Sequence, residues 1–270
     1  MGYTQIDVTP MTNVIGAIVR GPDLREQLDD ETVQELRAAW HEHKVLFLPG
    51  QPIDRAQHKR FASRFGQVFR HPYLKDVASD PDIVTLYSGG DTSSRYVANG
   101  WHTDVTFAEQ PPMGSIIRAI DVPSYGGDTM WLDLEAAFSG LSPSMQRFAS
   151  TLRATHAAPR AVFIPSDTTG EVIRSSHPVV RTHPVTGRRC LFVNPTFTRS
   201  LDGLTPSESN ALLAFLHTHC QQPEYQVRYH WEPDTIGMWD NCCTQHRVVA
   251  DNVDALRKME RITLQGETPT

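Results

Sequence analysis

Residues 101–107, Trp-His-Thr-Asp-Val-Thr-Phe, are the stretch of this sequence that says most about its fold and chemistry. If the stretch is an extended strand, residues i and i+2 point to the same side, so His102 and Asp104 project toward one point. One imidazole and one carboxylate then supply two of the three protein ligands of a facial triad, a metal site that keeps open positions for other ligands. Because a His-x-Asp pattern also occurs at solvated strand edges, the interpretation needs a third ligand from elsewhere in the chain.

His246 is the best candidate for that third ligand among the twelve histidines. It follows a strand-and-turn pattern over residues 234–241. His217 and His219 lie in a helical segment, where residues i and i+2 diverge. His41 and His43 close a helix, where imidazolium complements the helix dipole. His177 and His183 each precede a proline. The remaining histidines have no partner pattern: His58, His156 and His230.

Short strands separated by turns dominate the chain from about residue 80 onward. We expect strands at residues 83–87, 114–120, 128–132, 179–182, 190–194, 225–231, 235–239 and 261–264, with turns at 124–127 and 184–187. Before them come a strand at 14–19, a helix at 29–43 that Asp29 or Asp30 caps, a strand at 45–48 and a helix capped by Asp54 that ends at Gly66. Residues 134–152 and 206–220 are expected to be helical. The pattern predicts a mainly β fold with flanking helices, in a sandwich or barrel.

The composition is that of an ordinary globular protein, with 39% hydrophobic and 21% charged residues among 270. The net charge of −6 and the absence of a long Lys or Arg run argue against nucleic acid as a partner. No apolar stretch approaches the roughly 20 residues that span a bilayer, and the polar N-terminus is unlike a signal peptide. We therefore expect a cytoplasmic protein with no membrane partner.

The four cysteines, Cys190, Cys220, Cys242 and Cys243, include no C-x-x-C pair. Cys242 and Cys243 are adjacent, so on a strand they would point to opposite faces. We expect all four to be reduced thiols.

The motifs taken together resemble one enzyme family. The landmarks span nearly the whole chain: residues 15–17 (Ile-Gly-Ala), 101–107, 126–129 (Gly-Gly-Asp-Thr), 177–181 (His-Pro-Val-Val-Arg), 239–241 (Trp-Asp-Asn) and His246. The chain resembles the taurine dioxygenase / 2,4-dichlorophenoxyacetate dioxygenase family. The resemblance implies a double-stranded β-helix (jelly roll) and a reaction that uses Fe(II), 2-oxoglutarate and O2.

The resemblance also implies roles for individual residues. His102, Asp104 and His246 match the iron ligands. Thr129 and Arg257 match the residues that bind the distal carboxylate of 2-oxoglutarate, and a buried carboxylate does need a charge-assisted partner.

Five residues match positions that contact the substrate within the family: Arg261, His71, Tyr73, the backbone N–H of Val105 and the ring of Phe197. A cation, an imidazole that could itself be cationic and a hydroxyl suit a small organic anion, with a sulfonate as the first choice. Ala98 stands where the family has a pocket amide, which predicts a roomier, more apolar pocket unless Asn99 compensates. Residues 157–176 are expected to form a lid.

Several alternatives stay open from the sequence. The same chemistry could act on an alkyl sulfate ester, an aryloxyacetate or another carboxylate. Two His and one carboxylate could also hold the zinc of a hydrolase, and a non-catalytic jelly-roll binding module is a third possibility. We expect one domain over residues 1–270, a small anionic substrate as partner, and we leave a homo-oligomer open.

Overall fold

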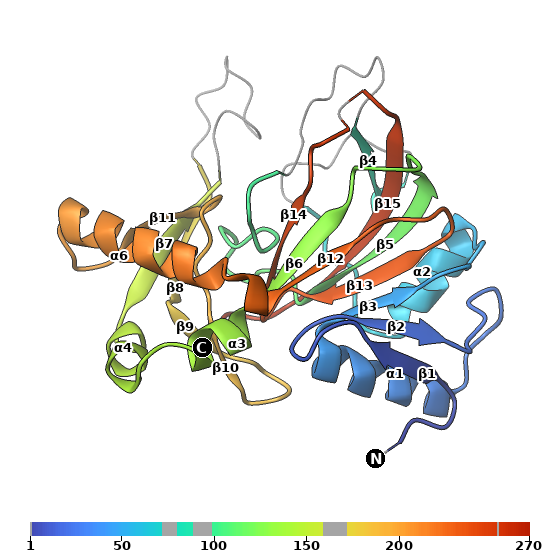
Figure 1. Ribbon diagram of the computed structural model, residues 1–270, viewed down its shortest axis with the longest axis horizontal. Helices are drawn as coiled ribbons and strands as arrows, with labels where there is room; N and C mark the ends of the chain where they lie inside the picture. The colour runs from blue at the N-terminus through green and yellow to red at the C-terminus, as the bar shows by residue number, and fades with distance from the viewer. Residues whose placement is uncertain (1, 72–79, 89–98, 159–171, 253) are drawn as a thin grey trace.

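The computed structural model describes residues 2–71, 80–88, 99–158, 172–252 and 254–270. Ten strands of two sheets form its central part (Figure 1). The seven-stranded sheet has the order β1 (Asp7–Pro10), β2 (Ala17–Arg20), β3 (Val45–Leu48), β13 (Ile236–Asp240), β5 (Gly114–Asp121), β15 (Arg257–Leu264) and β4 (Val84–Ser88). The three-stranded sheet has the order β12 (Gln226–Tyr229), β6 (Thr129–Asp133) and β14 (Thr244–Val248). The expectation of a mainly β fold is confirmed.

Strand β3 shows how one apolar run serves two cores. Side chains alternate across a strand, so Val45 and Phe47 pack with Trp131 and Trp231 between the two sheets. Leu46 and Leu48 point to the other face of the large sheet and join the helices there. The four-residue run is buried on both faces, which is why it has no polar position.

Helices α1 (Asp30–His43) and α2 (Arg55–Ser63) cover the outer face of the large sheet (Figure 1). Both begin at the expected caps, because Asp29 accepts the N–H of Thr32 and Asp54 forms a capping box with Gln57. The apolar face of α1, with Leu36 and Trp40, completes this core.

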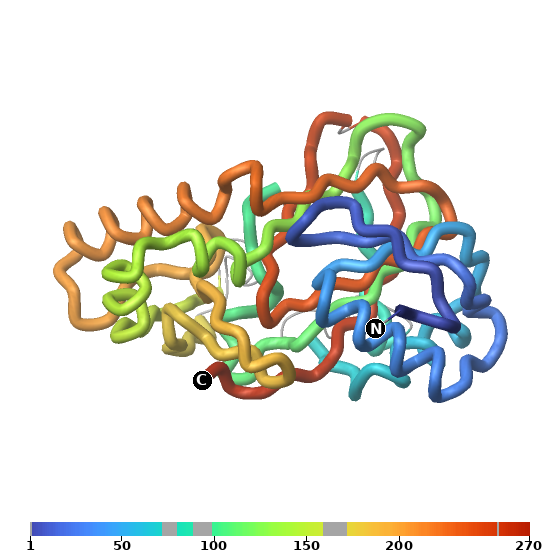
Figure 2. Tube along the Cα trace, turned by 60° about the horizontal axis from the view of Figure 1, so that its bottom comes forward, coloured from blue at the N-terminus to red at the C-terminus, as the bar shows by residue number. Residues whose placement is uncertain are grey.

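The remaining elements form a second region with its own core. They are α3 (Leu134–Ser139), α4 (Pro143–Ala149), β7 (Arg153–Ala157), β8 (Arg174–Pro178), β9 (Val180–Thr182), β10 (Arg189–Leu191), β11 (Thr198–Leu201), α6 (Pro206–Cys220) and the 3-10 turn η1 (Pro223–Tyr225). The C-terminal segment reaches from β15 to this region (Figure 2), where the N–H of Thr182 donates to the carbonyl of Thr270 at 2.7 Å. All four cysteines are buried and unpaired, as expected.

The structure corrects three expectations. Residues 134–152 form two helices instead of one, because Gly140 lies against the Tyr225 hydroxyl and Pro143 starts a new helix. Residues 101–107 are not a strand, since only His102 forms a β-bridge and residues 104–107 turn. Five strands were not expected, among them the polar β8 and β14, because their pairing partners and not their own pattern make them strands.

No helix in the described ranges is both long and apolar enough to cross a membrane.

Candidate metal centre

Two backbone hydrogen bonds join the segment that carries His102 to strand β14. The N–H of His102 donates to the carbonyl of His246 at 3.0 Å, and the N–H of His246 donates to that of His102 at 2.8 Å. This antiparallel bridge brings the two imidazole ring centres to 4.2 Å. Residues far apart in sequence therefore meet through the backbone.

The nitrogens of these histidines face one carboxylate oxygen. The Nδ1 of His102 lies 2.8 Å from the carbonyl of Gly100 and donates to it, which leaves the Nε2 lone pair available. That Nε2 lies 3.9 Å from Oδ1 of Asp104, and Nε2 of His246 lies 4.0 Å from the same oxygen. Ligand atoms of the three residues lie within 4.8 Å of one another.

Asp104 is oriented by residues to which the sequence assigned no role. The Ser115 hydroxyl donates to Oδ2 at 2.9 Å, and the Asn241 amide lies 3.4 Å from the same atom. Oδ1 therefore points toward the histidines, where it also accepts from Nη1 of Arg261 at 2.8 Å. The Trp-Asp-Asn motif was the available signal for Asn241; nothing in the sequence pointed to Ser115.

The local charges give all three residues the protonation that a cation site requires. Burial raises the pKa of Asp104, but the positive charge of Arg261 outweighs it, with smaller contributions from the histidines and the Ser115 hydrogen bond, and the pKa lies below its usual range. Burial lowers the pKa values of His102 and His246. At neutral pH the site presents a carboxylate and two neutral imidazoles, the donor set of an Fe(II) facial triad.

Arg257 is a buried cation that forms no ion pair with a carboxylate of the described residues. Arg257 is 6% exposed. Its guanidinium donates to the carbonyl of Gly127 at 3.2 Å and to the Thr129 hydroxyl at 3.3 Å. No carboxylate of the described residues lies within ion-pair distance of it. Burial lowers its pKa to about 10.

Thr129 accepts from Trp231 Nε1 at 2.8 Å as well as from Arg257, so its own O–H can be donated. Together Arg257 and Thr129 offer an anion two donors at a buried position.

Three of the expected substrate residues lie near the triad or next to it in sequence. Arg261 contacts Asp104, and Val105 follows it directly. The Phe197 ring stands edge-on to His102, with ring centres 6.0 Å apart. Tyr73 and Ala98 lie outside the described residues, as do 159–171 of the expected lid, and Asn99 is exposed.

The sequence left open whether His71 is cationic, and its surroundings favour the neutral form. Burial, followed by the charge of Arg261, lowers the pKa of His71 to about 4. The imidazole is therefore neutral at pH 7 and can only contribute as a neutral hydrogen-bonding group.

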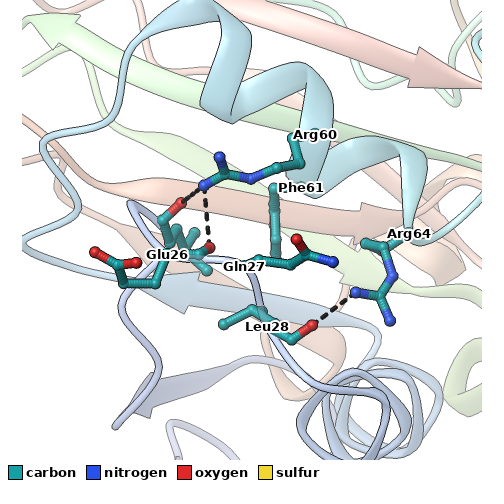
Figure 3. Close-up of a pocket in the computed structure, with 7 residues that line it drawn as sticks. Glu26, Gln27, Leu28, Arg60, Phe61 and Arg64 are labelled. Carbon is teal, nitrogen blue, oxygen red and sulfur yellow. Dashed lines mark hydrogen bonds between the residues drawn. The ribbon is translucent and has the colours of Figure 1, made fainter.

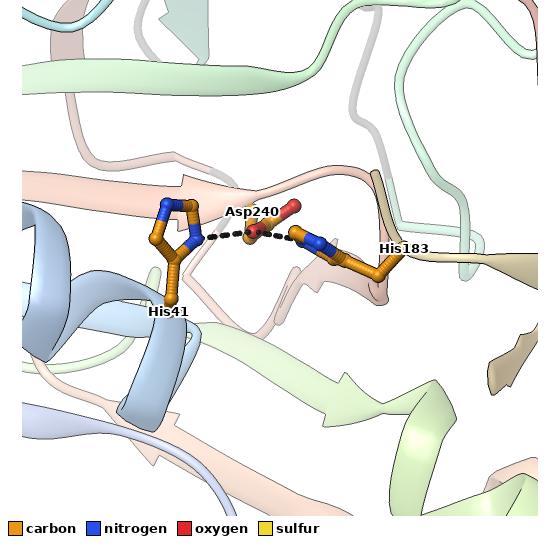
Figure 4. A group of neighbouring side chains, drawn as sticks. All are labelled: His41, His183 and Asp240. Carbon is orange, nitrogen blue, oxygen red and sulfur yellow. Dashed lines mark hydrogen bonds and ion pairs between the residues drawn. The ribbon is translucent and has the colours of Figure 1, made fainter. Parts of the chain in front are cut away.

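His41, His183 and Asp240 form a second cluster of metal-ligand types (Figure 4). Nδ1 of His183 accepts the N–H groups of Val185 and Thr186 at 3.1 and 3.2 Å, which places the imidazole proton on Nε2. That proton is donated to Asp240 at 2.8 Å, and His41 Nδ1 lies 3.6 Å from the same oxygen. Since the His183 nitrogen that faces Asp240 has no lone pair to offer, the cluster is a hydrogen-bonded support for β13.

A surface pocket between α2 and the loop at residues 24–28, before α1, has a structural role too (Figure 3). Arg60 donates to the carbonyls of Arg25 and Glu26 at 2.6 and 3.0 Å, and Arg64 donates to that of Leu28 at 2.7 Å. The two arginines fasten the loop to the helix.

Comparisons with known proteins agree with this geometry. The family model described as taurine catabolism dioxygenase TauD, TfdA family matches residues 7–263. An alpha-ketoglutarate-dependent sulfate ester dioxygenase of Pseudomonas putida is 35% identical over 98% of this chain and 91% of its own length. An alkylsulfatase of Acinetobacter baylyi is 35% identical over 98% of this chain and 87% of its own.

A crystal structure of a taurine dioxygenase from Burkholderia xenovorans superposes with a TM-score of 0.87 at 36% identity, covering 99% of this chain and 93% of that one. The likeness confirms the expected jelly roll, although the described sheets do not close into a barrel.

Proposed function

Because the chain belongs to the taurine catabolism dioxygenase TauD, TfdA family and is an Fe(II)- and 2-oxoglutarate-dependent dioxygenase, we propose that His102, Asp104 and His246 hold its iron. The convergence of the two Nε2 atoms on Oδ1 of Asp104, at 3.9 and 4.0 Å, is the observation that carries this assignment. The zinc-hydrolase and binding-module alternatives do not account for family membership.

Arg257 and Thr129 bind the distal carboxylate of 2-oxoglutarate in this proposal. A buried guanidinium without a carboxylate partner is unfavourable by itself, and a bound carboxylate would remove that penalty through a charge-assisted hydrogen bond. Iron with 2-oxoglutarate and O2 supplies the oxidation that converts a substrate C–H bond to C–OH, with release of succinate and CO2. The protein residues orient both organic molecules and exclude water.

Arg261 is the cation for the substrate anion. Its Nη1 lies 2.8 Å from Asp104, so an anion bound to this guanidinium would sit beside the metal. The neutral His71, the Val105 N–H and Tyr73 would complete the anion site, while Phe197 supplies an apolar wall with Val105 and Phe107. This combination favours an organic anion with an alkyl group.

The substrate class we propose is an alkyl chain that ends in a sulfur oxyanion. The sequence put a sulfonate first, and similarity to relatives named for sulfate esters and alkyl sulfates favours the sulfate ester. In either case hydroxylation at the carbon that bears the oxyanion gives an unstable product, which collapses to an aldehyde with release of sulfite or sulfate.

We also propose that residues 1–270 act as one catalytic domain, with residues 157–176 contributing to the pocket roof.

Succinate release, measured over alkyl sulfates, alkanesulfonates including taurine, and aryloxyacetates, tests the substrate class. We expect turnover of medium-length alkyl sulfates or sulfonates in preference to taurine. Anaerobic addition of Fe(II) and 2-oxoglutarate should give a visible charge-transfer band that is lost in Asp104→Ala. A band with no turnover of any sulfur oxyanion would reject the substrate class alone, and undiminished iron binding in Asp104→Ala would reject the site.

A further inference from the structure

Val105 adopts a backbone conformation that its side chain disfavours. Its φ is 51°, in the left-handed region, and β-branched residues there are genuine outliers. The residue directly follows Asp104 and is 3% exposed. Such outliers persist only where the surrounding structure holds them, and they gather at functional sites.

A histidine on strand β8 forms hydrogen bonds with the turn at residues 105–108. His177 on β8 is 1% exposed, and its Nε2 lies 3.0 Å from both the Thr106 and the Ala108 carbonyls. A carbonyl pair can only accept, so Nε2 carries the proton and donates to both. Because the pairing of β8 with β7 fixes His177, the imidazole is a rigid anchor for the turn.

Further buried groups fix the same turn. The Thr106 hydroxyl, on a fully buried residue, contacts His156 Nδ1 at 2.9 Å and accepts from Asn194 Nδ2 at 3.1 Å. The Ser175 hydroxyl donates to the Phe107 carbonyl at 3.0 Å. Within the turn, the Ala108 N–H donates to the Val105 carbonyl at 3.0 Å.

The Val105 N–H itself donates to no acceptor in the part of the chain that the structure describes. A buried N–H without a partner is rare. Val105 follows Asp104, and the Asp104 carboxylate contacts Arg261. An anion bound at Arg261 is therefore a candidate to accept the hydrogen bond of the Val105 N–H.

We propose that His177 is a positioning residue for the substrate: it keeps Val105 in the left-handed conformation and thereby aims the Val105 N–H at the substrate anion. The proposal rests on the function proposed above, in which that anion binds at Arg261. His177 touches neither metal ligands nor substrate; it acts through the carbonyls of Thr106 and Ala108.

The first test compares His177→Leu with His177→Gln. The Gln side-chain amide can place its two N–H groups near the position of Nε2 and donate to both carbonyls, whereas Leu cannot donate. We expect His177→Leu to raise the substrate KM by roughly tenfold or more, since small misplacements of a positioned group have large effects. The 2-oxoglutarate KM and the anaerobic Mn(II) affinity should stay unchanged, and His177→Gln should restore most of the substrate KM.

His219→Leu is the matched control, because it removes a similar bond from His219 Nε2 to the Ala137 carbonyl (2.8 Å) on remote α6. This variant should lower Tm, but it should not raise the substrate KM relative to the 2-oxoglutarate KM. Binding of inorganic sulfate to the Mn(II)-loaded protein gives a readout that needs no known substrate, and His177→Leu should weaken it as well. Equal changes in both KM values, or unaltered sulfate binding, would overturn the proposal.

The second test asks whether His177 acts through Val105. Glycine adopts positive φ without strain, so in a Val105→Gly background the loss of His177 should raise the substrate KM by a smaller factor than in the native background. The same factor in both backgrounds would show that His177 does not act through this backbone angle. If the wild-type protein gives no band with Fe(II) and 2-oxoglutarate, it is the proposed function that fails, not this assignment.

Discussion

The two oxygens of Asp104 have different partners, and that difference defines the site at the scale of single residues. Oδ2 is held by Ser115 and Asn241, while Oδ1 faces the histidines and Arg261. A carboxylate held by one oxygen presents the other in a fixed direction, which is how neighbours of metal ligands tune affinity. Ser115 and Asn241 therefore fix the direction of the carboxylate oxygen that we assign to the metal.

Ser115→Ala should weaken Mn(II) binding by about 10- to 100-fold, the range typical for loss of a residue that orients a ligand. Titration of the metal-free protein with Mn(II), followed by electron paramagnetic resonance, measures it. Ser209→Ala is the control, because Ser209 is equally buried and its hydroxyl accepts the Leu201 N–H far from the site. Equal Mn(II) affinities in the two variants would remove Ser115 from the site.

Arg257 and Arg261 lie on β15 with one same-facing position, Met259, between them, but they differ in their electrostatics. Arg261 has Asp104 as a counter-ion, whereas burial lowers the pKa of Arg257 to about 10 and no carboxylate pairs with it in the described ranges. The charged form of Arg257 is thus destabilised by folding throughout the neutral range. A bound dicarboxylate would stabilise the charged form of Arg257.

Arg257→Met should therefore raise Tm in the absence of 2-oxoglutarate and abolish the rise in Tm that 2-oxoglutarate gives the metal-loaded wild type. Loss of a charge-assisted pair to a buried carboxylate corresponds to about 2–5 kcal/mol, so the 2-oxoglutarate KM should rise by at least about thirtyfold. A retained Tm shift would place the cosubstrate anchor elsewhere.

At the scale of elements, the sequence interpretation of residues 101–107 was right about the side chains and wrong about the backbone. His102 and Asp104 do converge, but the stretch leaves extended geometry at Val105, and His102 pairs by a single bridge with His246. Spacing within the motif predicted that these two side chains meet. The turn could not be predicted because it depends on His177 and Asn194, whose contacts with it exist only after β8 and the segment before β11 have packed.

The turn at Gly126 and Gly127 is a second irregular element with a clear purpose. Both glycines have positive φ, at 72° and 68°, and the Gly127 carbonyl accepts from Arg257 Nε. Asp251, on the loop after β14, fixes the turn by accepting the Gly127 N–H at 2.9 Å. This loop thus connects the strand of His246 to the arginine that we assign to the cosubstrate.

Asp251→Ala should loosen that turn and raise the 2-oxoglutarate KM by a few-fold to tenfold, because one hydrogen bond is worth about 0.5–1.5 kcal/mol. Asp251→Asn keeps an oxygen for the Gly127 N–H and loses only the ion pair and hydrogen bond with the exposed Arg228, so it should stay near wild type. Steady-state succinate release with varied 2-oxoglutarate measures both. An effect of Asn as large as that of Ala would show that the pairing with Arg228 matters more than the turn.

At the scale of the whole molecule, the order of the large sheet is what the sequence could not supply. β3 from the first fifth of the chain lies beside β13, which lies beside β5 and then β15. Many of the individual strands were predictable as short runs between turns. Their order in the sheet is set by which faces share a core, and that depends on all of the strands at once. Resemblance to a family, and not periodicity, therefore predicted the jelly roll.

Two buried histidines and one half-buried histidine, in separate parts of the molecule, contribute to how its stability depends on pH. Burial lowers the pKa of His58 and of His217 to about 4 and that of His156 to about 3. They lie in the helix–sheet core, on α6 and behind the 105–108 turn. An unfolded chain keeps histidine pKa values near 6.5, so between pH 6.5 and 4 the unfolded state binds more protons than the folded state.

These three groups should therefore leave the free energy of unfolding of the metal-free protein nearly constant from pH 7.5 to 7. They should lower it as the pH drops from 6.5 to 4. Each fully transferred proton contributes a slope of about 1.4 kcal/mol per pH unit. His217 offers a clean subtraction, because its Nε2 is buried without a partner among the described residues. His217→Leu should flatten the slope between pH 6 and 4.5 by close to one proton. Urea unfolding at fixed ionic strength across this pH range gives the slopes. An unchanged slope in His217→Leu would mean that this imidazole is already protonated, and hence solvated, in the folded protein.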